Sequence, residues 1–313
     1  MRTDLNVTNN FYLIIGGTTK AATTSLFNYL ADHPQICATN IKETRFFLDA
    51  NYPLPSKYRF EDGLHKYEEF YSYSKDKKIR LEATPDYLYS FNTPQKIKDS
   101  LPKTKFIFIL REPVSRLISW YKYAKQIGKL PGEVTFDEYV QFQFKNDADS
   151  DSEQRVSHPS QFALKQGRYS LYLKYFLKVF NRDQIFIVFY EDFSKNPMLN
   201  LKSICTFADI DPEFYMNYDF KIFNRSDIMK SLKLHQFYVK FRIHARNYTY
   251  NKPVIHKILR KIRFTFEPIY LKFNAKSSEQ LSMSKATMKL LHDYYCHEAD
   301  NLTDLFGTRP PWK

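Results

Sequence analysis

The sequence predicts an α/β fold with a central parallel sheet and helices on both faces. Three apolar runs, at residues 11–15, 105–110 and 185–190, have the composition of strands that are buried on both faces of a parallel sheet. A segment with helical signals follows each run, as in alternating strand and helix units. With 43% hydrophobic and 17% aromatic residues, the chain can bury a core of this kind.

The length of 313 residues suits one large α/β domain or two small ones. The three cysteines, Cys37, Cys205 and Cys296, lie far apart and lack the paired spacing of a metal site, which suits a reducing cytoplasm. The N-terminal residues show no signal peptide, and no stretch has the length of a membrane span. We therefore expect a cytoplasmic protein.

The first predicted strand leads into a short loop that carries Lys20, and Thr23, Thr24 and Ser25 begin the next predicted helix. Backbone N–H groups at a helix N-terminus lack intrahelical partners and lie at the positive end of the helix dipole. Together with a lysine and three hydroxyls, they favour an anion such as phosphate. The alternative is an ordinary strand-to-helix turn with a capping hydroxyl and a solvated lysine.

This loop differs from the loop of ATP-binding P-loop proteins. In that loop the lysine is followed directly by Ser or Thr, whose hydroxyl binds Mg²⁺. Here Ala21 and Ala22 follow Lys20, so no hydroxyl adjoins the lysine in the metal position. The loop is therefore expected to hold a phosphate-like group without an obligatory metal.

A second candidate phosphate site follows the apolar run at 105–110. Arg111 comes directly after the run, so we expect it at the carboxyl end of a strand, where open α/β sheets bind ligands. Pro113 suits the first turn of the next helix, and Ser119 lies on the second turn, where it can face the same crevice. Arginine and serine both suit a phosphate. For this motif alone, a capped helix with an exposed arginine is the alternative.

Together the two motifs resemble those of sulfotransferases that use 3′-phosphoadenosine-5′-phosphosulfate (PAPS). Residues 20–26, KAATTSL, resemble the 5′-phosphosulfate loop, usually Lys-x-Gly-Thr-Thr/Ser-x-Leu, with Ala22 in place of the glycine. Residues 111–121 match the 3′-phosphate motif Arg-x-Pro-x-x-Arg-x-x-Ser-x-Tyr at every fixed position. The resemblance implies a P-loop-like sulfotransferase fold. It implies a donor site made of Lys20, Ala21, Ala22, Thr23, Thr24, Ser25, Arg111 and Ser119.

Three further segments resemble the acceptor side of sulfotransferases that are related to the glycosaminoglycan enzymes. Residues 42–47, KETRFF, match a family segment in which a glutamate shortly before Phe-Phe takes the proton of the acceptor. The resemblance makes Glu43 this base. From the residues alone, an ion pair of Glu43 with its charged neighbours is the alternative. Residues 63–67 and 82–87 resemble the family segments Gly-Leu-x-x-Tyr and Glu-x-(Thr/Ser)-Pro-x-Tyr, which border the acceptor cleft.

The second half of the chain carries weaker signals. Residues 135–158 are polar and acidic, and we expect a loop there; residues 283–305 have the spacing of one final amphipathic helix. Glu191 and Asp192 follow the apolar run at 185–190 and permit a Walker B interpretation with a magnesium ligand. In the sulfotransferase family, however, Tyr-Glu-Asp is a structural strand end.

Late in the chain, residues 224–226 resemble the Asn-x-Ser element of the family. Lys276 lies in a segment that resembles, loosely, the loop that closes over the cofactor. The resemblance implies a single domain, 1–313, with a core at 11–230 and 275–313. A basic helical insertion at about 231–274 interrupts this core.

Basic charge is concentrated near this insertion. Residues 221–276 contain fourteen lysines and arginines but only Asp227 and Glu267 as acids, while the whole chain has a net charge of +13. Such a block suits an acidic glycan, anionic lipid headgroups or nucleic acid. The alternative is a solvated helical pair. We expect this block to make peripheral contact with an anionic membrane, and we expect no nucleic acid partner.

The resemblance implies a PAPS-dependent sulfotransferase, with adenosine 3′,5′-bisphosphate (PAP) as a product and no metal requirement. Glu43 would deprotonate a hydroxyl or amine of the acceptor, and Lys20 would stabilise charge on the leaving group. A glutamate base and the basic block favour a carbohydrate or glycolipid acceptor. One alternative is a Mg²⁺-dependent nucleotide kinase or NTPase that uses Lys20 with Glu191 or Asp192. The other is a non-catalytic protein that binds nucleic acid or membrane through residues 221–276.

Overall fold

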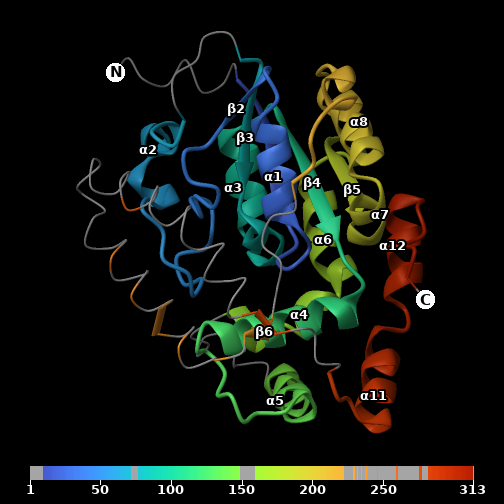
Figure 1. Ribbon diagram of the computed structural model, residues 1–313. Coiled ribbons are helices and arrows are strands. Elements are labelled where there is room, and N and C mark those ends of the chain that lie inside the picture. The colour runs from blue at the N-terminus through green and yellow to red at the C-terminus, as the bar shows by residue number, and fades with distance from the viewer. Residues whose placement is uncertain are drawn as a thin grey trace.

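The computed structural model describes residues 10–71, 77–148, 159–221 and 281–312, together with isolated positions between 228 and 276 (Figure 1). Within these residues, five parallel strands form the central sheet. They are β1 (Phe11–Gly17), β2 (Ile36–Ala38), β3 (Ile79–Ala83), β4 (Thr104–Leu110) and β5 (Ile185–Phe189). The parallel sheet that the apolar runs predict is confirmed.

The sheet has the strand order β2-β3-β1-β4-β5, with β1 at its centre. From β1 the chain first builds β2 and β3 on one side, and it then crosses to β4 and β5 on the other side. The order therefore reverses between β1 and β4. Open α/β sheets bind ligands at such a point, beyond the carboxyl ends of the strands. Both predicted phosphate motifs begin there, directly after β1 and β4.

Helices cover both faces of the sheet, as expected (Figure 1). Leu13 and Ile15 of β1 point into the apolar layer with α1 (Thr23–Ala31) and α8 (Pro197–Ala208). Tyr12 and Ile14 point into the opposite layer. This second layer contains α3 (Thr93–Ser100), α6 (Tyr169–Val179) and α12 (Glu298–Phe306). The short helices α2 (Leu64–Glu68) and α7 (Tyr190–Lys195) complete the core.

A separate apolar cluster joins α4 (Pro113–Gln126), α5 (Phe136–Ala148) and α11 (Lys285–Tyr295). The loop predicted at 135–158 is therefore wrong over 136–148, where α5 forms, and residues 149–158 lie outside the described part. Phe136, Tyr139 and Val140 supply the reason, since their helical spacing buries all three in the cluster. The acidic residues between them had suggested a loop.

The single helix predicted at 283–305 is also wrong, because the structure divides it into α11 and α12. Leu291 and Tyr295 of α11 pack with α4 and α5, whereas Leu302 and Phe306 of α12 pack against the sheet layer of α6. Because the two apolar faces pack against different partners, the chain must change direction between them, and it does so after Tyr295.

Most of the basic block at 221–276 lies outside the described residues, as does the Asn-x-Ser element at 224–226. Strands β6 (Ile228–Met229) and β7 (Ala275–Lys276) are described, and they pair in antiparallel orientation. The two segments that border the predicted insertion therefore lie side by side. Among the described helices, none combines the length and the apolar character that crossing a bilayer requires.

Glu298, in the first turn of α12, joins this helix to the start of α6. Its carboxylate is buried and accepts hydrogen bonds from the backbone N–H of Ser170 at 2.6 Å and from the Ser170 hydroxyl at 2.9 Å. Burial raises the pKa of Glu298 to about 7, and the two hydrogen bonds oppose this rise only in part.

We expect the Glu298→Gln variant to lose part of the pH dependence of stability. Between pH 4.5 and 7 the unfolded carboxyl releases its proton while the folded one keeps it, so in the native protein stability falls as pH rises. The change amounts to roughly 1–3 kcal/mol. Urea unfolding at pH 5 and pH 7 measures it. Asp304→Asn, at an exposed position of α12, is the control and should keep the wild-type slope; an unchanged slope in Glu298→Gln contradicts the assignment.

Candidate active site at the carboxyl edge of the sheet

The loop between β1 and α1, residues 18–25 and hereafter the Lys20 loop, has a strained backbone. Lys20 and Ala22 both adopt the left-handed conformation, with φ angles of 68° and 59°. Ala22 is the N-cap of α1 and supplies no side-chain hydrogen bond, so the first N–H groups of α1 lack a side-chain cap from this residue. Glycine adopts this conformation without steric cost. This explains why the related sequence pattern has glycine where this chain has Ala22.

The Lys20 ammonium lies in a partly enclosed position at the end of β1. Its Nζ is 4.0 Å from the ring centroid of Tyr123, a cation–π contact with α4. Burial lowers the pKa of Lys20 to about 8; the charge of Arg111 adds to the decrease, and the charge of Glu43 opposes it. Lys20 therefore lies within electrostatic reach of both a second cation and the candidate base.

Arg111, at the end of β4, contacts the Lys20 loop directly. Its Nη1 donates a hydrogen bond to the backbone oxygen of Lys20 at 3.2 Å, and its guanidinium carbon lies 4.5 Å from the centroid of the Tyr190 ring. Its Nε is buried and has no hydrogen-bond partner among the described residues. The two sequence motifs, 91 positions apart, thus meet in one place, with unused donor capacity on the arginine.

The structure describes the other predicted donor-site residues to different extents. Ser119 is buried on α4, and its hydroxyl makes no hydrogen bond with the residues that the structure describes. Lys276 has a described backbone, paired with Ile228, while its side chain lies outside the described part of the chain. Its contact with the donor site stays a prediction. The remaining predicted residues, Ala21, Thr23, Thr24 and Ser25, all lie in the Lys20 loop and the first turn of α1.

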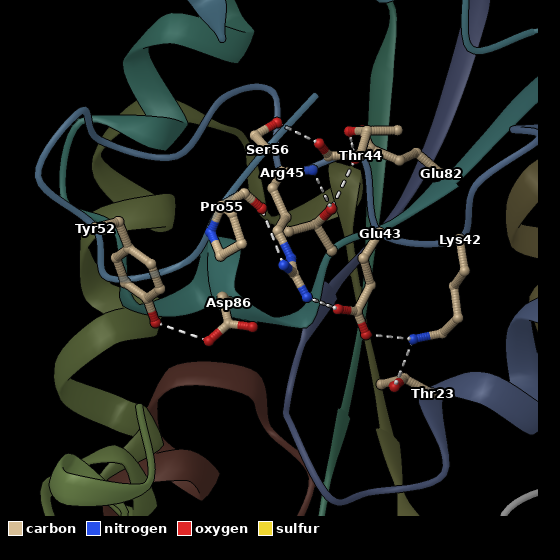
Figure 2. Close-up of polar contacts among 11 residues, drawn as sticks. Thr23, Lys42, Glu43, Thr44, Arg45, Tyr52, Pro55, Ser56, Glu82 and Asp86 are labelled. Carbon is tan, nitrogen blue, oxygen red and sulfur yellow. Dashed lines mark hydrogen bonds and ion pairs between the residues drawn. The ribbon is translucent and has the colours of Figure 1, made fainter. Parts of the chain in front are cut away.

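Glu43 is held between two cations, as Figure 2 shows. Its Oε1 lies 3.1 Å from Lys42 Nζ, and its Oε2 lies 2.9 Å from Arg45 Nη2. Burial raises the pKa of Glu43, but the charges and hydrogen bonds of the two cations outweigh it and bring this pKa to about 2. The ion pair that the residues alone favoured is therefore present. It does not exclude a role as base, because a bound anion would compete for the same cations.

Lys42 also links the candidate base to the Lys20 loop. Besides its contact with Glu43, Lys42 Nζ donates a hydrogen bond to the hydroxyl of Thr23 at 3.4 Å (Figure 2). Thr23 is the first residue of α1. One side chain therefore spans the distance between the predicted donor site and the predicted acceptor site.

The sequence did not reveal the residue that holds the acceptor-side segments together. Glu82, at the end of β3, is fully buried, and its carboxylate accepts four hydrogen bonds. Each donor is a hydroxyl: Thr84 and Tyr87 from its own segment, Thr44 from residues 42–47, and Tyr67 from residues 63–67. All three segments that the sequence assigned to the acceptor cleft thus converge on Glu82. In the sequence, this role of Glu82 was indicated only by the position of the glutamate at the start of the 82–87 motif.

A second carboxyl near Glu43 was also missed. Asp86 lies in the 3-10 helix η2 (Pro85–Tyr89) and is 4% exposed; its Oδ1 accepts a hydrogen bond from the Tyr52 hydroxyl at 2.8 Å. Burial and the charge of Glu43 raise the pKa of Asp86 to about 6, against the opposing effects of Tyr52, Arg45 and Lys42. Two carboxyls with very different proton affinities therefore lie on the acceptor side.

Glu191 has structural contacts that fit the strand-end role rather than the Walker B interpretation. Its Oε1 accepts a hydrogen bond from the backbone N–H of Glu112 at 2.9 Å, and its Oε2 accepts one from the Trp312 indole at 3.0 Å. Glu191 therefore fixes the start of α4 and the C-terminal segment. Within the described parts of the chain, no group of three or more His, Cys, Asp or Glu side chains is arranged to hold a metal ion.

Comparison with known proteins agrees with this geometry. Residues 12–241 match the sulfotransferase domain family. A solved structure, a sulfotransferase from Alicyclobacillus acidocaldarius, superposes with a TM-score of 0.64 at 18% sequence identity, covering 96% of this chain and 97% of that one. This likeness shows a shared fold.

Curated relatives include human heparan sulfate glucosamine 3-O-sulfotransferase 3B1, which is 30% identical over 213 residues. The match covers 65% of this chain and 48% of the relative, so the chain spans about half the length of that protein. The membrane-associated sulfotransferase kil1 of Dictyostelium discoideum is 35% identical over 120 residues, or 37% of this chain and 23% of kil1. Because the family match covers well over half of the sequence, this chain belongs to the sulfotransferase domain family.

Proposed function

We propose that this chain transfers a sulfuryl group from PAPS to a hydroxyl or amine of a glycan. The observation that carries the proposal is the contact between Arg111 and the Lys20 loop at the carboxyl ends of β1 and β4. A donor nucleotide with phosphate groups at both its 3′ and 5′ positions needs two anion sites at a short separation. The family membership and the two motifs fit the same donor.

The residues around this contact suit the donor chemically. The uncapped N–H groups of α1, with Lys20, Thr23, Thr24 and Ser25, would hold the 5′-phosphosulfate. Arg111, whose buried Nε lacks a partner among the described residues, and the buried Ser119 would hold the 3′-phosphate. Ala21 and Ala22 would contribute backbone groups, and Lys276 would close the site from the C-terminal side.

The transfer is an in-line displacement. The acceptor oxygen or nitrogen forms a bond to sulfur while the bond between sulfur and the bridging phosphate oxygen breaks, and PAP leaves. Lys20 stabilises the charge that develops on that oxygen. Glu43 receives the proton of the acceptor. No metal ion takes part in these steps.

The low pKa of Glu43 in the free chain is compatible with this role. Lys42 contacts both Glu43 and Thr23 of the Lys20 loop, and Lys20 interacts electrostatically with Glu43. Anionic groups bound in the loop would compete with Glu43 for these two cations. Weaker pairing and added negative charge both raise the pKa of a carboxylate. Donor binding would therefore convert Glu43 from an ion-pair partner into a stronger base.

The proposed acceptor is a carbohydrate or glycolipid. The curated relatives that match this chain include heparan sulfate glucosamine sulfotransferases, and their names suggest a sugar acceptor here too. The single-domain organisation with an insertion at 231–274 and the cytoplasmic location remain proposals. So does contact of the basic block with an anionic membrane.

We expect PAP to raise the melting temperature of the chain more than AMP or ATP does. At a concentration of 100 Kd, one ligand adds about 2.7 kcal/mol to the free energy of unfolding, a shift of a few degrees. Differential scanning fluorimetry measures it. In Arg111→Ala the shift with PAP should fall to the level of AMP, whereas Arg309→Ala, at an exposed position, should behave as wild type.

Equal shifts with PAP and AMP in the wild-type chain would contradict the donor assignment. Magnesium-dependent ATP turnover that disappears in EDTA would favour the kinase alternative. Binding of DNA, RNA or anionic vesicles that ignores Arg111→Ala, without any PAP effect, would favour the non-catalytic alternative.

Glu43→Gln should lower the turnover number by ~10²–10⁴-fold, because general-base assistance is lost. The PAP-induced shift in melting temperature should stay near the wild-type value. Transfer of ³⁵S from labelled PAPS to desulfated heparan oligosaccharides measures turnover. Glu69→Gln removes an exposed, ion-paired glutamate and is the matched control. A Glu43→Gln rate equal to that of Glu69→Gln would remove Glu43 from the mechanism.

A further inference from the structure

Asp86 has a carboxylate oxygen that the protein does not use. Its Oδ1 is held by the Tyr52 hydroxyl, whereas its Oδ2 accepts no hydrogen bond from any residue in the described part of the chain. This oxygen is not one of the buried side-chain atoms that lack a hydrogen-bond partner, so the 4% of the side chain that is exposed leaves it open to the surface. It can therefore accept a hydrogen bond from water or from a bound molecule.

This oxygen lies on the acceptor side of the site. Figure 2 shows it turned toward the Arg45–Glu43 pair, away from Tyr52. Glu43, Arg45 and Lys42 all lie close enough for their charges to affect the pKa of Asp86, and this pKa of about 6 leaves the carboxyl mostly ionised at neutral pH. In Figure 2, Glu43 lies between Asp86 on one side and Lys42 with Thr23 of the Lys20 loop on the other. Asp86 therefore lies beyond Glu43 when viewed from the donor loop.

Tyr52 fixes the orientation of Asp86. It belongs to the segment that follows residues 42–47, and its phenol is held in the neutral, donating form because burial and the charge of Asp86 raise its pKa well above the usual value. Arg45, whose Nη1 donates to the backbone oxygen of Pro55 at 3.0 Å, holds the same segment in place. The unused oxygen is thus presented by a rigid arrangement, not by a free side chain.

We propose that Asp86 is a specificity residue of the acceptor site and accepts a hydrogen bond from a second donor group of the sugar, adjacent to the group that is sulfated. The inference rests on the proposed function and names its substrate more closely. The acceptor carries a free hydroxyl or amine next to the reacting position, as in a vicinal diol or amino alcohol of a sugar ring. A carboxylate or sulfate at that adjacent position would be repelled by Asp86.

The test uses a desulfated heparan tetrasaccharide and analogues in which single hydroxyl or amino groups of one glucosamine are replaced by hydrogen. With the wild-type chain, one analogue should lose about 10- to 100-fold in kcat/KM, as expected for a hydrogen bond to a charged group. With the parent sugar, the Asp86→Ala variant should show the same loss in kcat/KM, mainly through a higher KM. It should no longer distinguish the parent from that analogue.

Controls separate this effect from loss of fold or donor binding. Asp86→Asn keeps the shape of the side chain, and both Asp86 variants should retain the PAP-induced rise in melting temperature. Asp99→Asn, at an exposed position of α3, should keep the wild-type preference among analogues. Tyr52→Phe leaves the carboxylate but frees its first oxygen, so it should weaken the discrimination without abolishing it.

Three outcomes would overturn the inference. Asp86→Ala could discriminate among the analogues as the wild type does, or it could match wild-type kcat/KM on the parent sugar; either result removes Asp86 from recognition and leaves the proposed function standing. Absence of ³⁵S transfer to every sugar by the wild-type chain, with the PAP shift intact, would defeat the glycan proposal and this inference with it.

Discussion

The buried carboxylate of Glu82 is the interaction on which the acceptor side depends. Placing a charge in the interior is costly unless hydrogen bonds replace the lost water, and here four hydroxyl donors do so. The donors come from three segments, which also meet through the aromatic rings of Phe47, Tyr67 and Tyr87. Loss of any one would leave the charge partly unsatisfied, so Glu82 forces Thr44, and with it the neighbouring Glu43, into a fixed position.

The donor side depends on backbone geometry, and for this reason much of it could be predicted. Lys20 follows the central strand and Arg111 follows its neighbour, so the strand order alone brings their backbones to the same edge of the sheet. The apolar runs identified the strands, and the loop residues identified the helix start. Both signals are local in sequence, so they can be recognised without knowledge of tertiary contacts.

The acceptor side could be predicted only in part, because its chemistry arises from side chains that meet through tertiary packing. Tyr52 and Asp86 are 34 positions apart, and nothing in either neighbourhood indicates the hydrogen bond between them. The segments that contain the four partners of Glu82 could be identified, but the hydrogen bonds that join them to Glu82 could not. The helix at 136–148 was missed for a related reason: acidic residues beside its apolar stripe concealed it, and one of its packing partners, α11, is distant in sequence.

The left-handed conformation of Ala22 makes the Lys20 loop depend on contacts with distant segments at the carboxyl edge of the sheet. For an L-amino acid, the left-handed conformation that glycine adopts freely costs roughly 1–2 kcal/mol of free energy. The contacts that hold the loop must therefore supply this free energy, and they come from distant segments: Arg111 on the Lys20 oxygen, Lys42 on Thr23, and Trp120 on Thr19. Local unfolding of β4, of α4 or of the segment around Glu43 would release the loop, so the anion site exists only when the whole edge is assembled.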